Sequence, residues 1–420
     1  MLILHLSDIH FRKSEVSTAQ DPNAHLRNEI IRDAESQCAL LGHPDVIIVS
    51  GDIAFAGDPD EFKFATEWLE ILCNACGCSL TSVFVVPGNH DVVRSIADSY
   101  YVQLAHRAIK AAANPLEEIG IQMRQLETQS MLYRSLDNYN QFASQFFCNL
   151  LPPERTRATR ELTLNDGSTL RLWGLNSAFL SSSSDREGEL FIDPASMQIM
   201  RSSGVVNLVV THHHLSWLGQ ARDFEDHIND VAPIQIFGHV HLNRIDMNRD
   251  YVRLTASAAN PDRHEGGWEP GYNLIEVSVN GKPNDRMLNI RAHVRVWQTA
   301  PGGFQAKMDR RSPVFEQHIK LEPWEASLVV AQAVEAQSID FAAVKTIEEG
   351  DTMDPLRDLG LRFYKLSFSK KLEIAGRLEL LDEEDMHLPD HERFRCVLIR
   401  AHERGKTEQL ADAVTIAEQG

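Results

Sequence analysis

The feature that most constrains the fold is an alternation of short apolar runs with longer amphipathic segments in the first hundred residues. Three runs of strand length, Leu2–Leu6, Val46–Val49 and Val83–Val86, are rich in branched apolar residues. Between them, Ala24–Leu41 and Asp60–Cys76 carry apolar residues at helical spacing. Strands that alternate with helices build layered α/β domains, because each helix buries its apolar stripe against a sheet. The sequence therefore predicts an α/β fold.

The next part of the chain divides into a helical segment and a β-rich segment. Arg94–Leu150 has few β-branched runs and many Ala, Gln, Leu and Glu residues, so we expect a helical insertion that could cap a site. Turn signals at Asn165-Asp166-Gly167 and Asn280-Gly281 separate apolar runs. The serine tract Ser181–Ser184 predicts a mobile loop. The predicted strands are Thr169–Leu175, Val205–Thr211, Gln235–Phe237, Tyr251–Ala256, Tyr272–Val279 and Leu288–Trp297.

A helical pattern replaces the β-rich pattern near the C-terminal quarter of the chain. Pro301-Gly302-Gly303 and Ser312-Pro313 are expected to end the β-rich part. Glu325–Gln337 predicts a helix or helical linker, and Asp351–Gln419 predicts several short amphipathic helices. We therefore expect two domains, a large one over residues 1–320 and a small all-α one over residues 325–420.

Five short segments of polar residues each follow an apolar run of the large domain. The carboxyl ends of strands in an open α/β sheet are where ligands usually bind. Alternate residues of an extended segment point the same way, so Asp8 and His10 can reach one ion, and so can His239 and His241. The five segments are Asp8-Ile9-His10, Gly51-Asp52, Gly88-Asn89-His90-Asp91, Thr211-His212-His213-His214 and Gly238-His239-Val240-His241.

The chemistry of these segments favours bound cations. A single histidine at a strand end is more often a satisfied polar residue than a ligand, and a lone Gly-Asp carries little information. As a set, however, buried carboxylates and imidazoles at this density are costly unless positive charge compensates them. Oxygen and nitrogen donors without a thiolate favour Mn, Fe, Zn, Co or Ni. The sequence thus predicts a site for divalent metal ions.

In this order, the five segments resemble those of the calcineurin-like metallophosphoesterase superfamily, over roughly residues 1–300. The resemblance implies an αββα sandwich, here with a helical insertion over about 94–150, and two divalent metal ions, with manganese the first choice. The ligands that it implies are Asp8, His10 and His241 for one ion, Asn89, His212 and His239 for the other, and Asp52 bridging both.

The fourth segment departs from the family's pattern. The family often has His-His-Pro there, whereas this chain has three consecutive histidines followed by Leu215-Ser216-Trp217-Leu218. Aligning that stretch with the Leu-x-Trp-Leu common in the family makes His212 the ligand, with His213 as the alternative. His214 then takes the position of the proline and is expected to be structural.

The resemblance also implies a reaction, the hydrolysis of a phosphoester by attack of a metal-bound hydroxide. His90 would act as an acid or charge stabiliser, and Asp91 would orient it. We expect a phosphodiester of a nucleotide or nucleic acid. The alternatives are a phosphomonoesterase, or a nucleotide-sensing or scaffold protein. Trp217 could stack a base or pack in the core. The basic residues that could bind a phosphate tail, or remain solvated surface charges, are Arg12, Lys13, Arg27 and Arg94.

The net charge and the cysteine content exclude some classes of partner and of scaffold. The net charge of -19 disfavours a general polyanion binder, because an acidic surface repels nucleic acid and anionic membranes at long range. Six cysteines are too few for a disulfide scaffold. Cys73, Cys76 and Cys78 could be half of a zinc site, but buried thiols at a helix end are the favoured interpretation. With no signal peptide or membrane span, we expect a cytoplasmic protein without a membrane partner.

The C-terminal region resembles the effector-associated or death-like helical adaptor modules of bacterial conflict-system enzymes. The resemblance lies in Leu361–Val414, which includes Phe363-Tyr364-Lys365-Leu366-Ser367 and Arg400-Ala401-His402-Glu403-Arg404-Gly405. It implies that residues 340–420 bind a protein partner or associate with themselves. The alternative is a helical extension that packs on the large domain.

Overall fold

The structure is a computed structural model, and it describes residues 1–16, 18, 21–241, 243–261, 268–325, 354–366, 368–382, 385 and 390–419. Within these residues, two mixed β-sheets form the centre of the molecule. The strands of the seven-stranded sheet are β1 (Leu2–Leu6), β2 (Val46–Val49), β3 (Val83–Val85), β10 (Gly271–Lys282), β11 (Asp285–Thr299), β12 (Gly302–Ala306) and β13 (Phe315–Lys320). Those of the six-stranded sheet are β4 (Arg157–Thr163), β5 (Thr169–Leu175), β6 (Val205–Thr211), β7 (Ile234–Phe237), β8 (Arg244–Met247) and β9 (Val252–Thr255).

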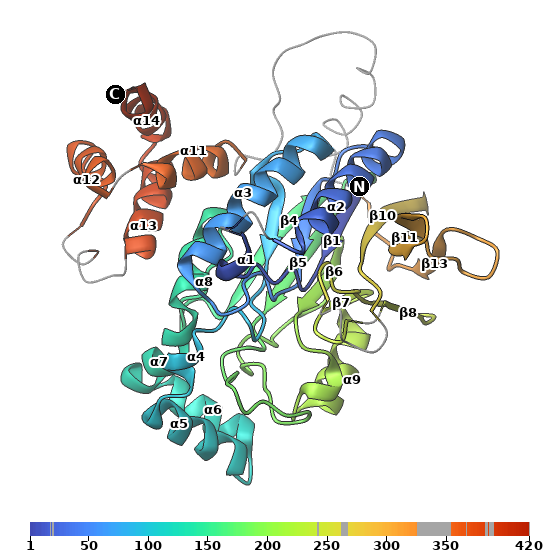
Figure 1. Ribbon diagram of the computed structural model, residues 1–420, viewed down its shortest axis with the longest axis horizontal. Helices are drawn as coiled ribbons and strands as arrows, with labels where there is room; N and C mark the ends of the chain where they lie inside the picture. Colours follow the sequence, from blue (N-terminus) through green and yellow to red (C-terminus); the bar gives the residue numbers. More distant parts are fainter. Residues whose placement is uncertain are drawn as a thin grey trace.

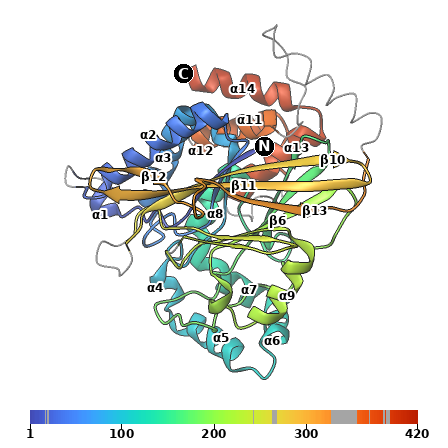
Figure 2. The same ribbon diagram turned by 90° about the vertical axis from the view of Figure 1, so that its right-hand side faces the viewer.

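The two sheets stack face to face between layers of helices. In Figure 2, α2 (Ala24–Leu41) and α3 (Pro59–Cys76) lie on one outer side and α9 (Ala221–Val231) lies on the other. The sheets approach closely at Gly174 of β5, where an added Cβ would lie 2.8 Å from Val86. The inward side chains of both sheets form one buried apolar core. This is the expected αββα sandwich.

Parallel pairing in the middle of each sheet positions the polar segments. β1 pairs in parallel with β2, and β2 with β3, while β5, β6 and β7 form a parallel run in the other sheet. All residues of β1, β2 and β3 are buried, as expected of strands covered on both faces. The carboxyl ends of these strands therefore meet at one edge of the sandwich.

The helix α3 begins and ends at well-defined caps. Asp58 is the N-cap, and Glu61 completes a capping box that fixes the start of the helix at Pro59. The helix ends where Gly77 adopts a left-handed conformation and the N–H of Cys78 donates to the carbonyl of Cys73. Cys73 and Cys76 are buried at this helix end, as the favoured interpretation of the cysteine cluster predicted.

The predicted insertion is helical. It comprises the helices α4 (Arg94–Ala97), α5 (Tyr100–Ala111), α6 (Pro115–Met123), α7 (Leu126–Tyr133) and α8 (Asp137–Ala143), together with short 3-10 turns. α4 to α7 gather at the lower left of Figure 1. The insertion meets the serine tract, since the N–H of Ser183 donates to Asp98 at 3.0 Å. Ser181 and Ser182 are buried whereas Ser183 and Ser184 are exposed, so the tract is a loop, as expected, whose first half is packed.

Two predictions about the β-rich part are wrong. Asn280-Gly281 does not form the turn between β10 and β11, because both residues pair with β11. The turn lies between Lys282 and Asp285, which form the last pair of the hairpin. The sheet also continues beyond Pro301 and Ser312-Pro313, since β12 and β13 both pair with β11. These two short strands were missed because proline and glycine residues next to them read as the end of the sheet.

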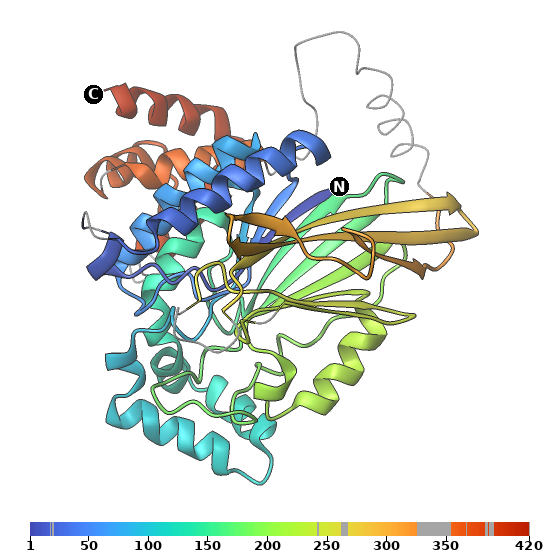
Figure 3. The ribbon, with the colours of Figure 1, turned by 45° about the vertical axis from the view of Figure 1, so that its right-hand side comes forward.

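The C-terminal helices form a second core. α11 (Asp354–Lys365), α12 (Phe368–Arg377), α13 (Asp390–Glu403) and α14 (Thr407–Gln419) enclose buried residues such as Phe363, Phe394 and Val414. Figure 3 shows these red helices beside the blue α3. Gly360 of α11 lies against the ring of Phe147, which precedes β4. The predicted helix at residues 325–337 falls almost wholly outside the described residues.

Candidate metal centre

The structure brings the five polar segments together at one edge of the sandwich. Backbone hydrogen bonds tie neighbouring segments to one another: Asp8 N–H donates to Gly51 at 3.1 Å, and Gly238 N–H donates to His212 at 2.9 Å. The carboxylate and imidazole side chains form four overlapping groups, and within each group the donor atoms lie within 4.8 Å of one another. These groups are Asp8, His10 and His241; Asp8, Asp52 and His212; His10, Asp52 and His90; and His212, His213 and His239.

Asp52 links the two halves of this cluster. Its Oδ2 lies 3.2 Å from Nε2 of His10 and 3.3 Å from Nε2 of His212. On one side, Nε2 of His241 lies 3.2 Å from Oδ1 of Asp8. On the other, Nε2 of His212 lies 3.1 Å from Oδ1 of Asn89. One carboxylate therefore faces two separate sets of donors, as a bridging ligand would.

The backbone of the site is strained. Asp8, His10, Asp52, His239 and His241 have φ angles between 52° and 69°. They are five of the eight non-glycine residues with positive φ in the described chain. Such conformations cost on the order of 1–3 kcal/mol each and persist where the surrounding structure holds them, often at functional sites. The strain turns these side chains from a regular strand direction towards a shared centre.

Glycines allow the segments to approach this closely. An added Cβ on Gly51 would lie 2.6 Å from Nδ1 of His212, and one on Gly88 would lie 2.2 Å from Oδ1 of Asp52. One on Gly238 would lie 2.3 Å from the hydroxyl of Ser7. The glycines that precede the polar residues therefore have a packing role, in addition to easing the turn at Gly51, whose φ is 96°.

The electrostatics of the cluster fit bound cations. Burial opposes ionisation of Asp52, but His212 and His10 hold its pKa well below the usual range. Burial likewise opposes the charged form of His212, yet Asp52 and Asp8 raise the pKa of this imidazole to about 9. Asp8 is also fully buried, and Nε2 of His241 lies 3.2 Å from its Oδ1. Two buried carboxylates thus require positive charge, which divalent metal ions would supply.

The fourth segment offers two candidate ligands, because His212 and His213 both belong to a donor group with His239. A backbone carbonyl can only accept, so Nδ1 of His212 must donate to Ser50, at 2.9 Å, and leaves Nε2 free to bind a cation. Nδ1 of His213 pairs with the hydroxyl of Ser177 at 2.8 Å, and its buried Nε2 has no hydrogen-bond partner among the described residues. His214 contacts Ser216 beside a short 3-10 turn, in keeping with a structural role.

The residue that holds His90 is not Asp91, contrary to our expectation. Nδ1 of His90 donates to the backbone carbonyl of Phe55 at 2.8 Å, and the two rings stack with centroids 4.9 Å apart. Asp91 accepts the N–H groups of Ala54 and Gly88, both at 2.8 Å. Burial and the charge of Asp52 raise the pKa of Asp91 to about 8. Asp91 therefore ties together the loops that carry the second and third segments.

The basic residues near the site differ in their availability. Arg27 is buried in an ion pair with Asp21, and Lys13 pairs with Asp60 at 2.6 Å. Neither is free for a phosphate. The guanidinium carbon of Arg12 lies 3.8 Å from the centroid of the Phe55 ring. Arg94 is the first residue of α4, close after the third segment.

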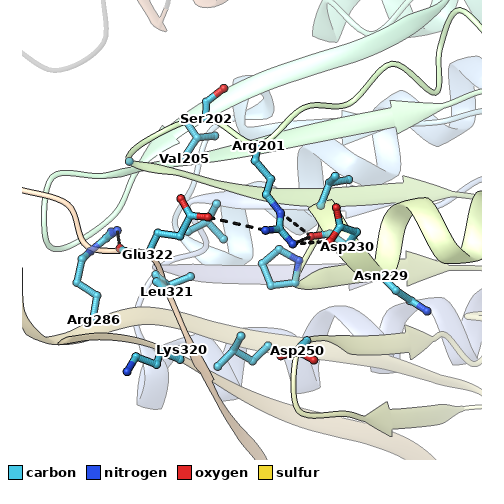
Figure 4. Close-up of a pocket in the computed structure, with 15 residues that line it drawn as sticks. Arg201, Ser202, Val205, Asn229, Asp230, Asp250, Arg286, Lys320, Leu321 and Glu322 are labelled. Carbon is cyan, nitrogen blue, oxygen red and sulfur yellow. Dashed lines mark hydrogen bonds and ion pairs between the residues drawn. The ribbon is translucent and has the colours of Figure 1, made fainter. Parts of the chain in front are cut away.

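A separate cavity of about 280 Å³ lies at the end of β6 that is opposite to the metal centre (Figure 4). Val205, the first residue of β6, lines it, whereas His212 follows the last residue of the same strand. Arg201 in this cavity pairs with Asp230 at 2.6 Å and with Glu322 at 3.8 Å. These paired charges, and the distance along β6, separate the cavity from the metal centre.

Comparisons with known proteins agree with this architecture. The model of the calcineurin-like phosphoesterase family matches residues 1–243, and that of a GTPase-associated adaptor domain matches residues 355–416. The uncharacterised metallophosphoesterase-like protein YydB of Bacillus subtilis (strain 168) is 24% identical over 76% of this chain and 67% of its own length. The glycerophosphodiester phosphodiesterase GpdQ of Enterobacter lignolyticus is 34% identical over 22% of this chain and 30% of its own.

The similarity to solved structures is low. GAP50, described as the anchor in the inner membrane complex of Plasmodium, aligns with 84% of this chain and 99% of its own, at 11% identity and a TM-score of 0.40. Among the described helices, none is both long enough and apolar enough to cross a membrane.

Proposed function

The chain belongs to the calcineurin-like phosphoesterase family and is therefore a hydrolase of phosphoesters, and from this premise we propose that it cleaves a phosphodiester of a nucleotide or nucleic acid with two divalent metal ions. The observation that supports two ions is the position of Asp52, whose Oδ2 lies between Nε2 of His10 and Nε2 of His212. Among the metals that oxygen and nitrogen donors favour, manganese is our first choice, ahead of iron, zinc, cobalt and nickel.

The ligand assignment follows the two sides of Asp52. Each proposed ligand is a side chain of one of the five segments, and the donors on each side lie within reach of one ion. The proposed ligands are Asp8, His10 and His241 for the first ion, Asn89, His212 and His239 for the second, and Asp52 for both.

Bound at these positions, two divalent ions would lower the pKa of coordinated water and neutralise phosphoryl oxygens. The protein's own side chains would supply proton transfer and positioning. His90 uses Nδ1 to hold the carbonyl of Phe55, so its Nε2 is the nitrogen that can serve the leaving oxygen as acid or charge stabiliser. Asp91 acts as a positioning residue by fixing the loops of Asp52 and Gly88.

The preference for a diester can be tested directly. The full-length protein, stripped with EDTA and reloaded with Mn²⁺, should hydrolyse bis(p-nitrophenyl) phosphate faster than p-nitrophenyl phosphate. The stripped protein should hydrolyse neither, and titration should saturate at two ions per chain. Faster hydrolysis of the monoester would establish the alternative, a phosphomonoesterase. Tight nucleotide binding without turnover would instead favour a nucleotide-sensing or scaffold protein.

The helical domain has a separate proposed role. We propose a catalytic domain over residues 1–320 and a partner-binding domain over residues 325–420, because the adaptor-domain match falls within the second core. Its ligand would be another protein or a second copy of this chain. Sedimentation of the full-length protein over a range of concentrations tests self-association, and Ile416→Glu, a change at an exposed apolar residue of α14, provides the matched variant.

A further inference from the structure

Two aromatic side chains flank the proposed metal centre, one near each ion. Trp217 lies against His239, with ring centroids 4.3 Å apart and planes at 84°. Phe55 lies near His10, with centroids 6.1 Å apart, and stacks on His90. Both Trp217 and Phe55 are only partly buried. Each therefore retains ring surface that the core does not cover, while Trp217 also packs against the main apolar core.

The setting of Trp217 suits a stacking platform. Its ring is perpendicular to that of His239 and lies at 36° to that of His213, 6.1 Å away, so neither imidazole is stacked flat on the indole. Its backbone is fixed, because the carbonyl of Trp217 accepts the N–H of Leu190 at 3.1 Å and the next residue, Leu218, is buried. Nucleobases stack on rigid, partly exposed aromatic rings of this kind, with little dependence on which base it is.

The setting of Arg12 suits a second anion. Its guanidinium carbon lies over the ring of Phe55, 3.8 Å from the centroid. Its side chain is 32% exposed, and its ion-pair contact with Glu15 is long, at 3.8 Å. Arg27 and Lys13, by contrast, are committed to closer carboxylates. Of these three basic residues, Arg12 has the longest carboxylate contact and is the one that we expect to bind a substrate phosphate.

The arrangement distinguishes between substrates. An aromatic platform on one side and a cation on the other suit a phosphate that carries two different substituents. The net charge of -19 argues against a long polyanion, which the surface would repel at long range. We propose that the site binds a short nucleotide phosphodiester, with its base stacked on Trp217 and a second phosphate on Arg12. This inference rests on the proposed phosphodiesterase function.

Three esters with the same leaving group test the proposal on the full-length, Mn²⁺-loaded protein. They are methyl p-nitrophenyl phosphate, thymidine 5′-(p-nitrophenyl phosphate) and the latter with a 3′-phosphate. The value of kcat/KM should rise along this series. Trp217→Leu should lower the thymidine-to-methyl ratio about tenfold, and Trp217→Tyr should retain most of it. Arg12→Gln should lower the additional gain from the 3′-phosphate about tenfold, with partial rescue by Arg12→Lys.

Two further variants and a binding measurement complete the test. Trp324→Leu and Arg32→Gln, which alter the same residue types away from the site, should leave both ratios as in the wild type. Calorimetric titration with thymidine 3′,5′-bisphosphate should show weaker binding to Trp217→Leu and Arg12→Gln at unchanged metal content. Ratios that survive in both variants would overturn this inference and leave the phosphodiesterase function standing. A metal-loaded wild type that cleaves none of the esters would overturn both.

Discussion

His90 donates a hydrogen bond from Nδ1 to the backbone carbonyl of Phe55, at 2.8 Å. The proton must lie on Nδ1, because a carbonyl oxygen can only accept. The partner is a backbone atom of a residue that is not a proposed ligand, and the stacked Phe55 ring holds the imidazole from one face. The backbone N–H of His90 donates to Oδ1 of Asp52 at 2.8 Å, but Phe55 holds its side chain. A change of the side chain alone should therefore separate chemistry from metal binding.

Substitutions at His90 and Asp52 should both abolish hydrolysis, but for different reasons. His90→Ala should lower kcat by about 10²–10⁴-fold, the usual effect of losing a proton-transfer group, and retain two ions per chain. Asp52→Asn removes the charge between His10 and His212 and should also lower metal content. Elemental analysis after desalting, combined with hydrolysis of bis(p-nitrophenyl) phosphate, separates the two effects. Equal metal loss in both variants would refute this division.

Asp91 should prove important for stability. Asp91→Ala would leave the N–H groups of Ala54 and Gly88 buried without partners, at about 1–3 kcal/mol each. Asp91→Asn should cost less, because the amide oxygen can still accept one of them. Urea unfolding of the metal-free protein measures both. If Asp91→Ala unfolds like the wild type but is inactive with its metals bound, Asp91 has the direct catalytic role that we do not assign to it.

His106 in the insertion should make the protein sensitive to mild acid. It is 2% exposed, and neither ring nitrogen has a hydrogen-bond partner among the described residues. Burial lowers its pKa to about 4. Between about pH 4 and 6.5 the unfolded chain then binds more protons than the folded one, so stability falls as pH drops below about 6.5.

The matched variant for this effect is His106→Leu, which has no proton to bind. The wild type should lose about 2 kcal/mol of its free energy of unfolding between pH 6.5 and 5 through His106, and His106→Leu should lose correspondingly less. Urea unfolding of both proteins at the two pH values gives the comparison. Parallel losses in the two proteins would show that His106 is not the titrating group.

The ion pair between Asp385 and Arg400 should stabilise the helical domain and leave the stability of the large domain unchanged. Two nitrogens of Arg400 lie 2.6 Å and 3.1 Å from the carboxylate, and Asp385 is 4% exposed. Arg400 also donates to the carbonyl of Leu380 at 2.6 Å. Asp385→Ala should destabilise this domain by about 2–3 kcal/mol. Hydrogen exchange should rise in α11 to α14 without change in β1 to β3, and the rate of phosphodiester hydrolysis should stay the same.

The parts of the site that could be predicted from the sequence are those that a short sequence pattern marks. The strand ends that carry Asp8, Asp52 and His239 are local patterns, each an apolar run followed by a donor, and the structure places all of them at one edge. The contact between His90 and Phe55 spans 35 positions and involves a backbone carbonyl, which leaves no mark on the sequence. Asp91 next to His90 suggested an orienting role, but its carboxylate points into the loops.

The differences outside the site concern a predicted turn and a predicted mobile loop. Asn280-Gly281 has the residues of a tight turn, yet tertiary pairing keeps both in the ladder and places the turn after Lys282. The serine tract has a loop composition, but Asp185 accepts the N–H of Ser182 at 2.8 Å and Asp98 accepts that of Ser183. Propensity describes what a segment does alone, whereas hairpin pairing and acceptors such as Asp185 and Asp98 decide the conformation here.

The packing role of Gly88 gives the most specific prediction about the site. An added Cβ would lie 2.2 Å from Oδ1 and 2.4 Å from the backbone nitrogen of Asp52. The backbone of Asp52 is already strained, with φ of 53°, and its buried carboxylate has no room to retreat. Gly88→Ala should therefore displace the proposed bridging ligand, lower metal affinity at least tenfold and lower hydrolysis with it.

Gly376→Ala is the control for that change, since nothing lies within 4 Å of the position where its Cβ would be. It introduces the same methyl group into α12, where alanine is favoured over glycine by about 1 kcal/mol. Isothermal titration with Mn²⁺ should show weakened binding for Gly88→Ala and wild-type binding for Gly376→Ala. Wild-type metal affinity in a folded Gly88→Ala protein would mean that Asp52 does not hold the ions from the position the structure gives it.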